Sequence, residues 1–386
     1  MHVLKRINWV TATFLVLTPL TAVVWGGVHI AHFGVYPFEV LLCLLYIAAT
    51  GFSITAGYHR HFAHGAYECR WFVKAFYLMF GAAAFQHSVL SWASDHRRHH
   101  LNIDEDLDPY NIKRGFLWAH VGWLMVKRPQ PDDFSNIPDL VADPMIRLQH
   151  RFYVPLAIAM GFGMPLAIGY AIGYPWGCLL WAGVLRTVLV HHSTFFVNSL
   201  AHTLGKRPYS IAVSARDSVV TALLTMGEGY HNFHHRFATD YRNGVLRHQW
   251  DPTKWLIRAL AGIGWAWGLS RTPREKIVAA EIECDTEQLA LRWKGHSADA
   301  MAYVRASVAE FQAAVERSAA RLGELERQVA RAGERFGRER QRQLDRLGLE
   351  LRIARREFRH SRSRWRKAIA ELHAMPSLPS PAMASL

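Results

Sequence analysis

Cysteine is scarce in this chain of 386 residues, and charge is modest for its length. The four cysteines, Cys43, Cys69, Cys178 and Cys284, lie far apart and never form a C-x-x-C pair. This excludes a disulfide scaffold, a rubredoxin-like centre and a cysteine zinc finger. Charged residues make up only 20% of the chain and hydrophobic residues 51%, which also excludes a disordered chain.

The formal net charge of +14 would ordinarily suggest a nucleic-acid partner. Here, however, the basic residues of the first 273 positions cluster between long apolar runs, and the rest lie in a densely charged C-terminal third. We therefore expect no nucleic-acid partner and interpret the charge as that of membrane-protein loops plus a basic tail.

Four apolar runs have the length of about 20 residues that a helix needs to cross a bilayer. They cover residues 9–30, 37–57, 152–173 and 176–197. The sequence thus predicts an all-α membrane protein with four transmembrane helices. A cleaved signal peptide is the alternative for the first run, but no A-x-A-like site follows it.

Basic residues indicate the orientation of these runs. Lys5 and Arg6 precede the first run, and further Lys and Arg residues crowd the loop between the second and third. By the positive-inside rule, both termini and this loop are expected in the cytoplasm. A fifth apolar segment, 71–92, is predicted to be one helix lying along or dipping into the cytoplasmic interface, because a crossing would separate the histidine clusters on either side of it.

Nine of the 22 histidines fall in four short clusters. The first is H-x-x-x-x-H, two have the form H-x-x-H-H, and one is a single histidine in N-S-L-A-H. Their members are His59 and His64; His96, His99 and His100; His202; and His231, His234 and His235.

Helix geometry indicates what these clusters can do. Residues i, i+3 and i+4 share a helix face, so each H-x-x-H-H is expected to present three imidazoles to one point. Nine ligands suit two metal ions, but imidazole binds Zn, Cu, Fe and Ni, so ligand type alone leaves the metal open. His191 and His192, inside the fourth run, are expected either to hydrogen-bond the ligands or to pack structurally.

The motifs D-H-R-x-H-H, N-S-x-x-H and G-E-G-x-H-N-x-H-H, following H-x-x-x-x-H, resemble those of the integral-membrane acyl-CoA desaturases of the stearoyl-CoA, delta-9 type. I-T-A-G at 54–57 and Q-W-D-P-T-K-W at 249–255 strengthen the resemblance, the latter looking like bacterial members. The resemblance covers about residues 8–275. It implies four transmembrane helices under a cytoplasmic cap, in a bacterial inner membrane, with the active site cytoplasmic.

The same resemblance implies a di-iron centre that uses O2 to place a cis double bond in a saturated acyl-CoA. The nine clustered histidines match the family's ligands, and Asn198 matches a position that reaches one metal through water. Asp95 and Glu228 are the carboxylates nearest the boxes and are expected to orient the imidazoles. A membrane hydroxylase, an acyl-lipid desaturase and, from another class, a membrane zinc protein are the alternatives.

Substrate contacts are also implied by the resemblance. Trp92, Gln86 and Thr194 match positions that shape a bent acyl tunnel, and residues 47–51 are candidates for its floor. Lys127, Arg128 and Asp95 match contacts to coenzyme A. Ser94 stands where vertebrate members have arginine, which leaves an acyl-carrier protein or a lipid-bound acyl chain open as substrate. Since no electron-carrier motif is present, a separate donor of the ferredoxin, rubredoxin or cytochrome b5 type is expected.

The sequence predicts three domains: 1–273, a charged helical extension over 274–375, and a disordered tail over 376–386. Apolar residues at coiled-coil spacing, such as Leu322, Leu325, Leu351 and Phe358, predict one or two long helices in the extension. Self-association, docking of the electron donor, binding of the acidic inner leaflet and a plain solvated appendage remain open as its role.

Overall fold

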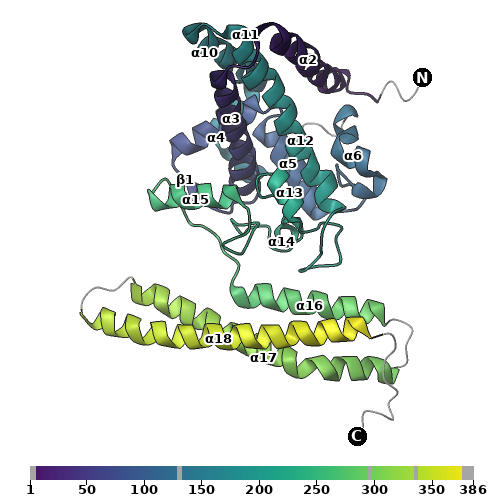
Figure 1. Ribbon diagram of the computed structural model, residues 1–386, viewed down its shortest axis with the longest axis vertical. Coiled ribbons are helices and arrows are strands. Elements are labelled where there is room, and N and C mark those ends of the chain that lie inside the picture. The colour runs from purple at the N-terminus through teal and green to yellow at the C-terminus, as the bar shows by residue number, and fades with distance from the viewer. Residues whose placement is uncertain (1–5, 128–132, 294–297, 334–337, 376–386) are drawn as a thin grey trace. The chain divides into compact units, whose positions relative to one another are not determined.

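The computed structural model describes residues 6–127, 133–293, 298–333 and 338–375 (Figure 1). The chain is mostly helical and divides into two compact units. The first, the histidine unit, comprises Met1–Lys206 and Val213–Arg271; the second, the C-terminal unit, comprises Arg207–Ala212 and Thr272–Leu386. Arg128 and the predicted tail at 376–386 lie outside the described residues.

Among the described residues, three helical stretches are long and apolar enough to cross a membrane: Trp9–Phe33, Pro37–Ala63 and Tyr153–Ile172. The first is helix α2. The second joins α3 (Pro37–Phe52) to a π-helix, η1 (Ser53–Ala63). The third consists of α9 (Tyr153–Ile158), the π-helix η4 (Ala159–Gly163) and α10 (Met164–Ile172). These helices fit a membrane protein.

The fourth predicted run is helical as well, through α11 (Pro175–Cys178), the π-helix η5 (Leu179–Leu185) and α12 (Arg186–Ser199). It carries Arg186, His191 and His192, and it is not among the stretches apolar enough to span. Arg186 is fully buried and donates to the carbonyl oxygens of Ala182, Ala83 and Gly161. A fourth crossing therefore stays a prediction.

The prediction of one helix over 71–92 is wrong, because the segment breaks in the middle. Helix α4 (Trp71–Ala83) ends before a turn, and α5 (Val89–Leu101) begins after Ser88, whose Oγ accepts the Ser91 N–H. Phe85 and His87 in the turn have positive φ values of 55° and 71°, a backbone region that side chains other than glycine rarely adopt. With 13 residues, α4 is about 20 Å long, too short for a bilayer crossing.

Short elements close the histidine unit around its core of apolar side chains from η1, α4, α5 and α15. Strand β1 (Glu68–Cys69) pairs antiparallel with β2 (Ala266–Trp267), which joins the segment after η1 to the C-terminal end of the unit. The remaining elements are η2 (Ile112–Arg114), α6 (Phe116–His120), η3 (Gly122–Met125), α7 (Pro138–Ala142), α8 (Pro144–Arg151), η6 (Leu200–His202), α13 (Val219–Leu224), α14 (His231–Arg236) and α15 (Pro252–Gly262).

The C-terminal unit contains three long helices, where one or two were predicted: α16 (Arg274–Arg292), α17 (Ala298–Gly333) and α18 (Arg338–Ala374) (Figure 1). They share one apolar core, in which Leu322, Leu325, Leu351 and Phe358 are buried as their spacing predicts. This core is closed by the chain's own α16, with Val278, Ile282 and Leu289. The apolar stripes therefore pack against one another within the unit.

Candidate metal centre

The nine clustered histidines come together in two groups in the histidine unit. The five-histidine group consists of His59, His64, His96, His100 and His234. The four-histidine group consists of His99, His202, His231 and His235. In each group, one nitrogen of every imidazole lies within 4.8 Å of one nitrogen of every other.

The expectation that each H-x-x-H-H presents three imidazoles to one point is wrong. Helix α5 sends His96 and His100 to the five-histidine group but His99 to the other group, and α14 likewise separates His234 from His231 and His235. Successive residues of an α-helix are rotated by about 100°, so neighbours such as His99 and His100 diverge while the i, i+4 pair stays together. The two boxes therefore link the two groups.

The first box depends on the π-helix η1. The His64 N–H donates to the His59 carbonyl oxygen at 3.1 Å, a hydrogen bond that spans five residues. The two rings consequently lie close together, with centroids 4.9 Å apart. The cluster at 231–235 lies on the short helix α14. Asp217 caps this helix, because its carboxylate accepts hydrogen bonds from the backbone N–H groups of Asn232 and Phe233.

The imidazoles approach one another through their Nε2 atoms. These atoms are 2.8 Å apart between His64 and His96, and 3.0 Å apart between His59 and His234. In the four-histidine group, the Nε2 atoms of His231 and His235 are 3.0 Å apart, and the buried Nε2 of His202 has no hydrogen-bond partner among the described residues. Nitrogens that converge in this way, one of them buried and unpartnered, fit metal ligands.

Burial also favours the form of histidine that binds metals. It is the main cause that lowers the pKa of seven of the nine side chains, with the neighbouring imidazoles adding to it: His64, His96, His100, His202, His231, His234 and His235. The pKa of His202 falls to about 3. At neutral pH these imidazoles are therefore uncharged, as metal ligation requires.

Three of the ligand candidates are oriented through Nδ1. His59 Nδ1 is 2.8 Å from Glu228 Oε2, and His99 Nδ1 is 2.8 Å from Asp108 Oδ1. His202 Nδ1 is 2.7 Å from Ser214 Oγ, which also bonds Asp104. Such partners fix the ring and direct Nε2 toward a metal. Glu228 was predicted from the sequence; Asp108 and Ser214 were missed, although the acidic loop directly after the second box was a usable signal for Asp108.

A buried ion-pair network supports Glu228. Arg60 donates to Glu228 Oε1 at 2.8 Å, to both carboxylate oxygens of Asp251 and to the Tyr241 carbonyl oxygen. Burial alone would raise the pKa of Glu228, but Arg60 and His59 outweigh it and hold the pKa at about 2. The carboxylate facing His59 is therefore permanently ionised near neutral pH.

A cavity of about 1040 Å³ adjoins the histidines within the same unit. Its wall includes His59, His96 and Glu228 at the metal groups, and mostly apolar residues elsewhere. The three residues predicted to shape the acyl tunnel, Gln86, Trp92 and Thr194, line this cavity, and so does Asp95, which was predicted to contact coenzyme A. Ile47 and Gly51, candidates for a tunnel floor, line it too.

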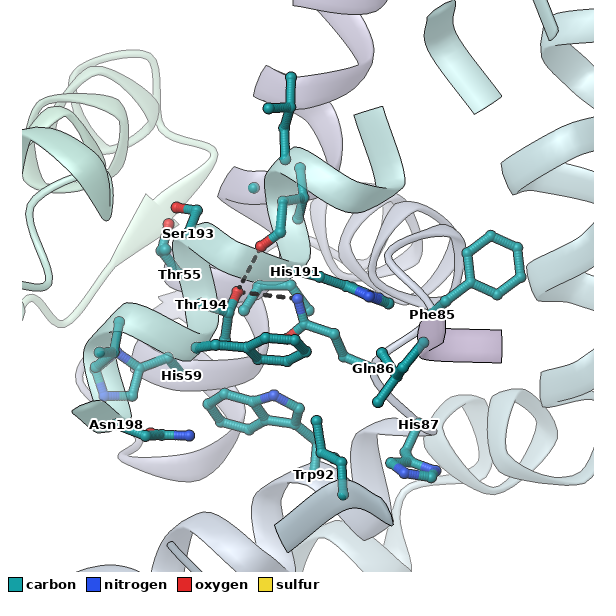
Figure 2. Close-up of a pocket in the computed structure, with 18 of the residues that line it drawn as sticks. Thr55, His59, Phe85, Gln86, His87, Trp92, His191, Ser193, Thr194 and Asn198 are labelled. Atoms are coloured by element: carbon teal, nitrogen blue, oxygen red, sulfur yellow. Dashed lines mark hydrogen bonds between the residues drawn. The ribbon is translucent and has the colours of Figure 1, made fainter. Parts of the chain in front are cut away.

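Figure 2 shows Gln86 and Thr194 facing each other in this cavity, where Gln86 Nε2 donates to Thr194 Oγ1 at 2.9 Å. Trp92 lies beside the five-histidine group: its ring stacks on His96 with centroids 4.9 Å apart and meets His59 edge-on at 6.1 Å. Phe85 and His87, the residues of positive φ at the break between α4 and α5, also line the wall. A mostly apolar cavity of this size suits a long aliphatic chain better than a polar ligand.

Comparison with known proteins identifies the family. Residues 37–267, which hold all nine histidines, match the family model described as fatty acid desaturase. The chain belongs to the fatty acid desaturase family. The predicted resemblance to membrane desaturases is confirmed at the level of family membership.

Individual relatives have related names. The chain is 37% identical over 324 residues to a "Probable acyl-CoA desaturase" of Schizosaccharomyces pombe, and 36% identical over 290 residues to "Acyl-CoA desaturase 1" of Saccharomyces cerevisiae. These alignments cover 82% and 74% of this chain but only 66% and 56% of those relatives. "Stearoyl-CoA desaturase 5" of Bos taurus is 33% identical over 252 residues, which is 63% of this chain and 74% of the relative.

The length of these alignments and the organisms of the relatives test two expectations from the sequence. The fission-yeast alignment covers a larger share of this chain than the first 273 residues can supply, so similarity continues into the C-terminal unit. The expectation that resemblance ends near Arg274 is therefore wrong for this relative. The interpretation as a bacterial type stays a prediction, because these relatives are eukaryotic.

The remaining expected contacts of the desaturase family are placed as follows. Asn198 lines the cavity in the last turn of α12, four residues before His202. Lys127 is exposed and does not line the cavity; its backbone N–H donates to the Arg6 carbonyl oxygen. Asp95 lines the cavity, and Ser94 donates to Asn136 Oδ1 at 2.8 Å.

His191 and His192 do not belong to either metal group of this desaturase-family chain. His191 Nε2 lies 2.9 Å from the Ala84 carbonyl oxygen, at the break between α4 and α5. His192 Nδ1 lies 3.0 Å from His120 Nε2 on α6. Of the two interpretations left open from the sequence, these contacts favour structural packing.

Proposed function

We propose that this chain is an O2-dependent acyl-CoA desaturase that introduces a cis double bond, at the delta-9 position, into a saturated acyl chain. The observation that carries the proposal is the junction of two histidine groups with one apolar cavity. Family membership and the relatives' names support desaturation over hydroxylation or a zinc-dependent activity.

Two iron ions would be held by the five-histidine and four-histidine groups, and Asn198 would complete the latter through water. The chemistry that iron supplies when bound is the activation of O2, which unactivated methylene C–H bonds require. The nine imidazoles fit this donor set because they are buried or partly buried, mostly uncharged and convergent.

The chain's own residues position the reaction. Glu228 and Asp108 each accept a hydrogen bond from an Nδ1–H group, so that Nε2 of His59 and His99 stays free to ligate. Trp92, stacked on His96, would set the distance between the acyl chain and the metal groups. The Gln86–Thr194 hydrogen bond would bend the chain near the reacting carbons, and the apolar wall would exclude water.

The rest of the proposal concerns substrate binding, placement in the membrane and the supply of electrons. Lys127 and Arg128 would bind the coenzyme A phosphates, with Asp95 as a further contact. The helices would form four crossings under a cytoplasmic cap in a bacterial inner membrane, with both termini cytoplasmic. A separate electron donor of the ferredoxin, rubredoxin or cytochrome b5 type would re-reduce the centre. An acyl-lipid substrate is the second candidate, favoured by Ser94 in place of an arginine.

Expression in a host that lacks unsaturated fatty acids, with an electron donor supplied, tests the activity. Mass spectrometry of the lipids should show new monounsaturated chains and locate the double bond. His231→Ala should abolish the product while membrane insertion persists, whereas the exposed His248→Ala should not change it. Unsaturation that never appears in the presence of donor and iron would contradict the proposal, and a zinc-only metal content would contradict the di-iron centre.

A further inference from the structure

Helix α18 of the C-terminal unit carries a row of arginines on one face. Arg352, Arg356, Arg359 and Arg366 follow one another at helical spacing and are all exposed; we name them the α18 row. The row extends about 21 Å along the helix axis. Among the described residues, none of its four guanidinium groups lies within ion-pair distance of a carboxylate. Arg366, however, lines the same groove as Glu281 and Asp285 of α16 and interacts with both electrostatically. Arg352, Arg356 and Arg359 carry the uncompensated positive charge of the row.

Other charges of the same bundle are paired inside the unit. Arg362 of α18 pairs with Glu281 of α16, and Arg355 pairs with Glu326 of α17 at 3.4 Å. Asp285 of α16 accepts the Trp365 Nε1–H at 2.9 Å. Acidic side chains of α16 and α17 are thus engaged on the inner side of α18 and at Arg366, and they leave Arg352, Arg356 and Arg359 on the outer side without an acidic partner in the described part of the chain.

Apolar side chains continue this outer face toward the N-terminal end of α18. Leu349 and Ile353 are 54% and 47% exposed and lie within one turn of Arg352 and Arg356. A helix face that combines several arginines with a few exposed aliphatic side chains is typical of a helix that lies on a negatively charged bilayer surface. Acidic headgroups complement the charge, and the aliphatic side chains reach the headgroup boundary.

The covalent connection strengthens the case for lipid as the partner. The C-terminal unit is joined to a unit with three helices long enough to cross a bilayer, so lipid headgroups are present at high effective concentration. We propose that the α18 row binds the anionic phospholipid headgroups of the membrane in which the histidine unit is embedded. Each charge is expected to strengthen this contact about fivefold.

A quenching experiment on the full-length chain tests the proposal. All four native cysteines are buried, so a fluorophore can be attached at Ser363→Cys, an exposed position on the same face. The protein is placed in nanodiscs of phosphatidylcholine alone or with one third phosphatidylglycerol, both containing lipids with a nitroxide on the headgroup. We expect strong quenching only in the anionic discs, and its loss at about 1 M salt, where the Debye length falls to about 3 Å.

Matched variants separate the row from net charge. Arg352→Gln, Arg356→Gln, Arg359→Gln and Arg366→Gln together should reduce quenching to the level in neutral discs, whereas the four corresponding Arg→Lys changes should keep it. As control, four exposed arginines of α17 are changed to Gln, which removes the same charge and should preserve quenching: Arg317, Arg321, Arg327 and Arg331. Circular dichroism should show unchanged helicity, since the row makes no ion pairs among the described residues.

Three results would overturn the proposal: equal quenching in neutral and anionic discs, quenching that survives loss of the row, or equal loss in the α17 control. Salt-sensitive binding of an acidic soluble ferredoxin to the row without lipid-dependent quenching would instead assign the row to protein docking. The quenching readout does not depend on desaturase activity, so it stands or fails separately from the proposed function.

Discussion

Charged side chains are used in opposite ways in the two units of this chain. In the histidine unit, Arg60 and Glu228 are 1% and 4% exposed and share their bonds with Asp251 and His59. In the C-terminal unit, Arg321 and Glu357 form a similar pair with 56% and 46% of their side chains exposed. Removing one member of a buried ion pair is strongly destabilising, because the other charge stays buried without a partner. A solvent-exposed ion pair contributes little to stability.

The cores of the two units differ in polarity as well. The core of the C-terminal unit consists of leucine, valine, phenylalanine and tryptophan side chains between three helices. The histidine unit places polar and charged groups at its centre, including nine imidazoles and the carboxylates that orient them. Apolar packing tolerates exchange of similar side chains, whereas a polar network requires each partner. Substitutions of core residues should therefore have larger effects in the histidine unit than in the C-terminal unit.

The largest effect is expected from a ligand histidine. His202→Ala should lower desaturation by more than about 100-fold and reduce bound iron. Removing a residue that only orients a ligand lowers metal affinity or activity about 10–100-fold, and removing the ligand itself should lower them further. The exposed His360→Ala in the C-terminal unit should change neither. Product formation and metal content of the purified protein measure both. Activity retained by His202→Ala would remove His202 from the four-histidine group.

The buried network comes next. Arg60→Met should destabilise the histidine unit by about 3–5 kcal/mol, because it leaves Glu228 and Asp251 charged and buried without their partner. Arg321→Gln should destabilise the C-terminal unit by less than about 1 kcal/mol. Amide hydrogen exchange, read separately for peptides of each unit, gives both values in one protein. Similar losses in the two units would contradict the contrast drawn here.

A smaller effect should follow from a residue that orients a ligand. Asp108→Asn keeps the shape of the side chain but removes the charge that faces His99 Nδ1, so activity or iron affinity should fall about 10–100-fold. Asp106, two residues earlier in the same loop, is exposed, and Asp106→Asn is the matched control. Iron titration of the two variants would show the difference; equal affinities would make Asp108 a merely structural residue.

The smallest effect is expected from Asp285 in the C-terminal unit. Burial raises its pKa, and the hydrogen bond from Trp365 opposes this only in part. The folded unit then binds this proton more readily than the unfolded chain, so the carboxylate lowers stability as pH rises above its unfolded pKa. Asp285→Asn should raise stability at pH 7 by up to about 1 kcal/mol. The gain should vanish near pH 3, as hydrogen exchange of α16 and α18 can show.

Residue spacing made much of the site predictable. The nine histidines could be selected because their intervals fit helix faces, and Glu228 could be selected because it adjoins the third box. The division into groups of five and four could not, since it depends on how α5 and α14 are oriented toward each other. Arg60 and Asp251 are 191 residues apart, and nothing in their local sequence marks them as partners.

Hydropathy predicted the three long apolar stretches well but gave no sign of the break between α4 and α5. The break rests on two residues of positive φ, Phe85 and His87. Their conformation is stabilised by tertiary contacts such as the hydrogen bond that the His87 N–H donates to the Tyr153 hydroxyl oxygen. The heptad-like spacing in the extension identified the buried residues correctly. It could not show that α16 supplies the third side of the core.

The π-helix η1 ties the length of the first histidine box to the winding of its backbone. In an α-helix, residues five apart are rotated by about 140°, which would turn His64 away from the ring of His59. The five-residue hydrogen bond between them compensates for the extra residue. Shortening the box by one residue should therefore be compatible with the same pair of ligands only if the segment rewinds as an α-helix. An insertion or deletion in this box would therefore convert one helix type into the other. Sequence alignments across the box should treat a one-residue gap as an exchange between π-helix and α-helix.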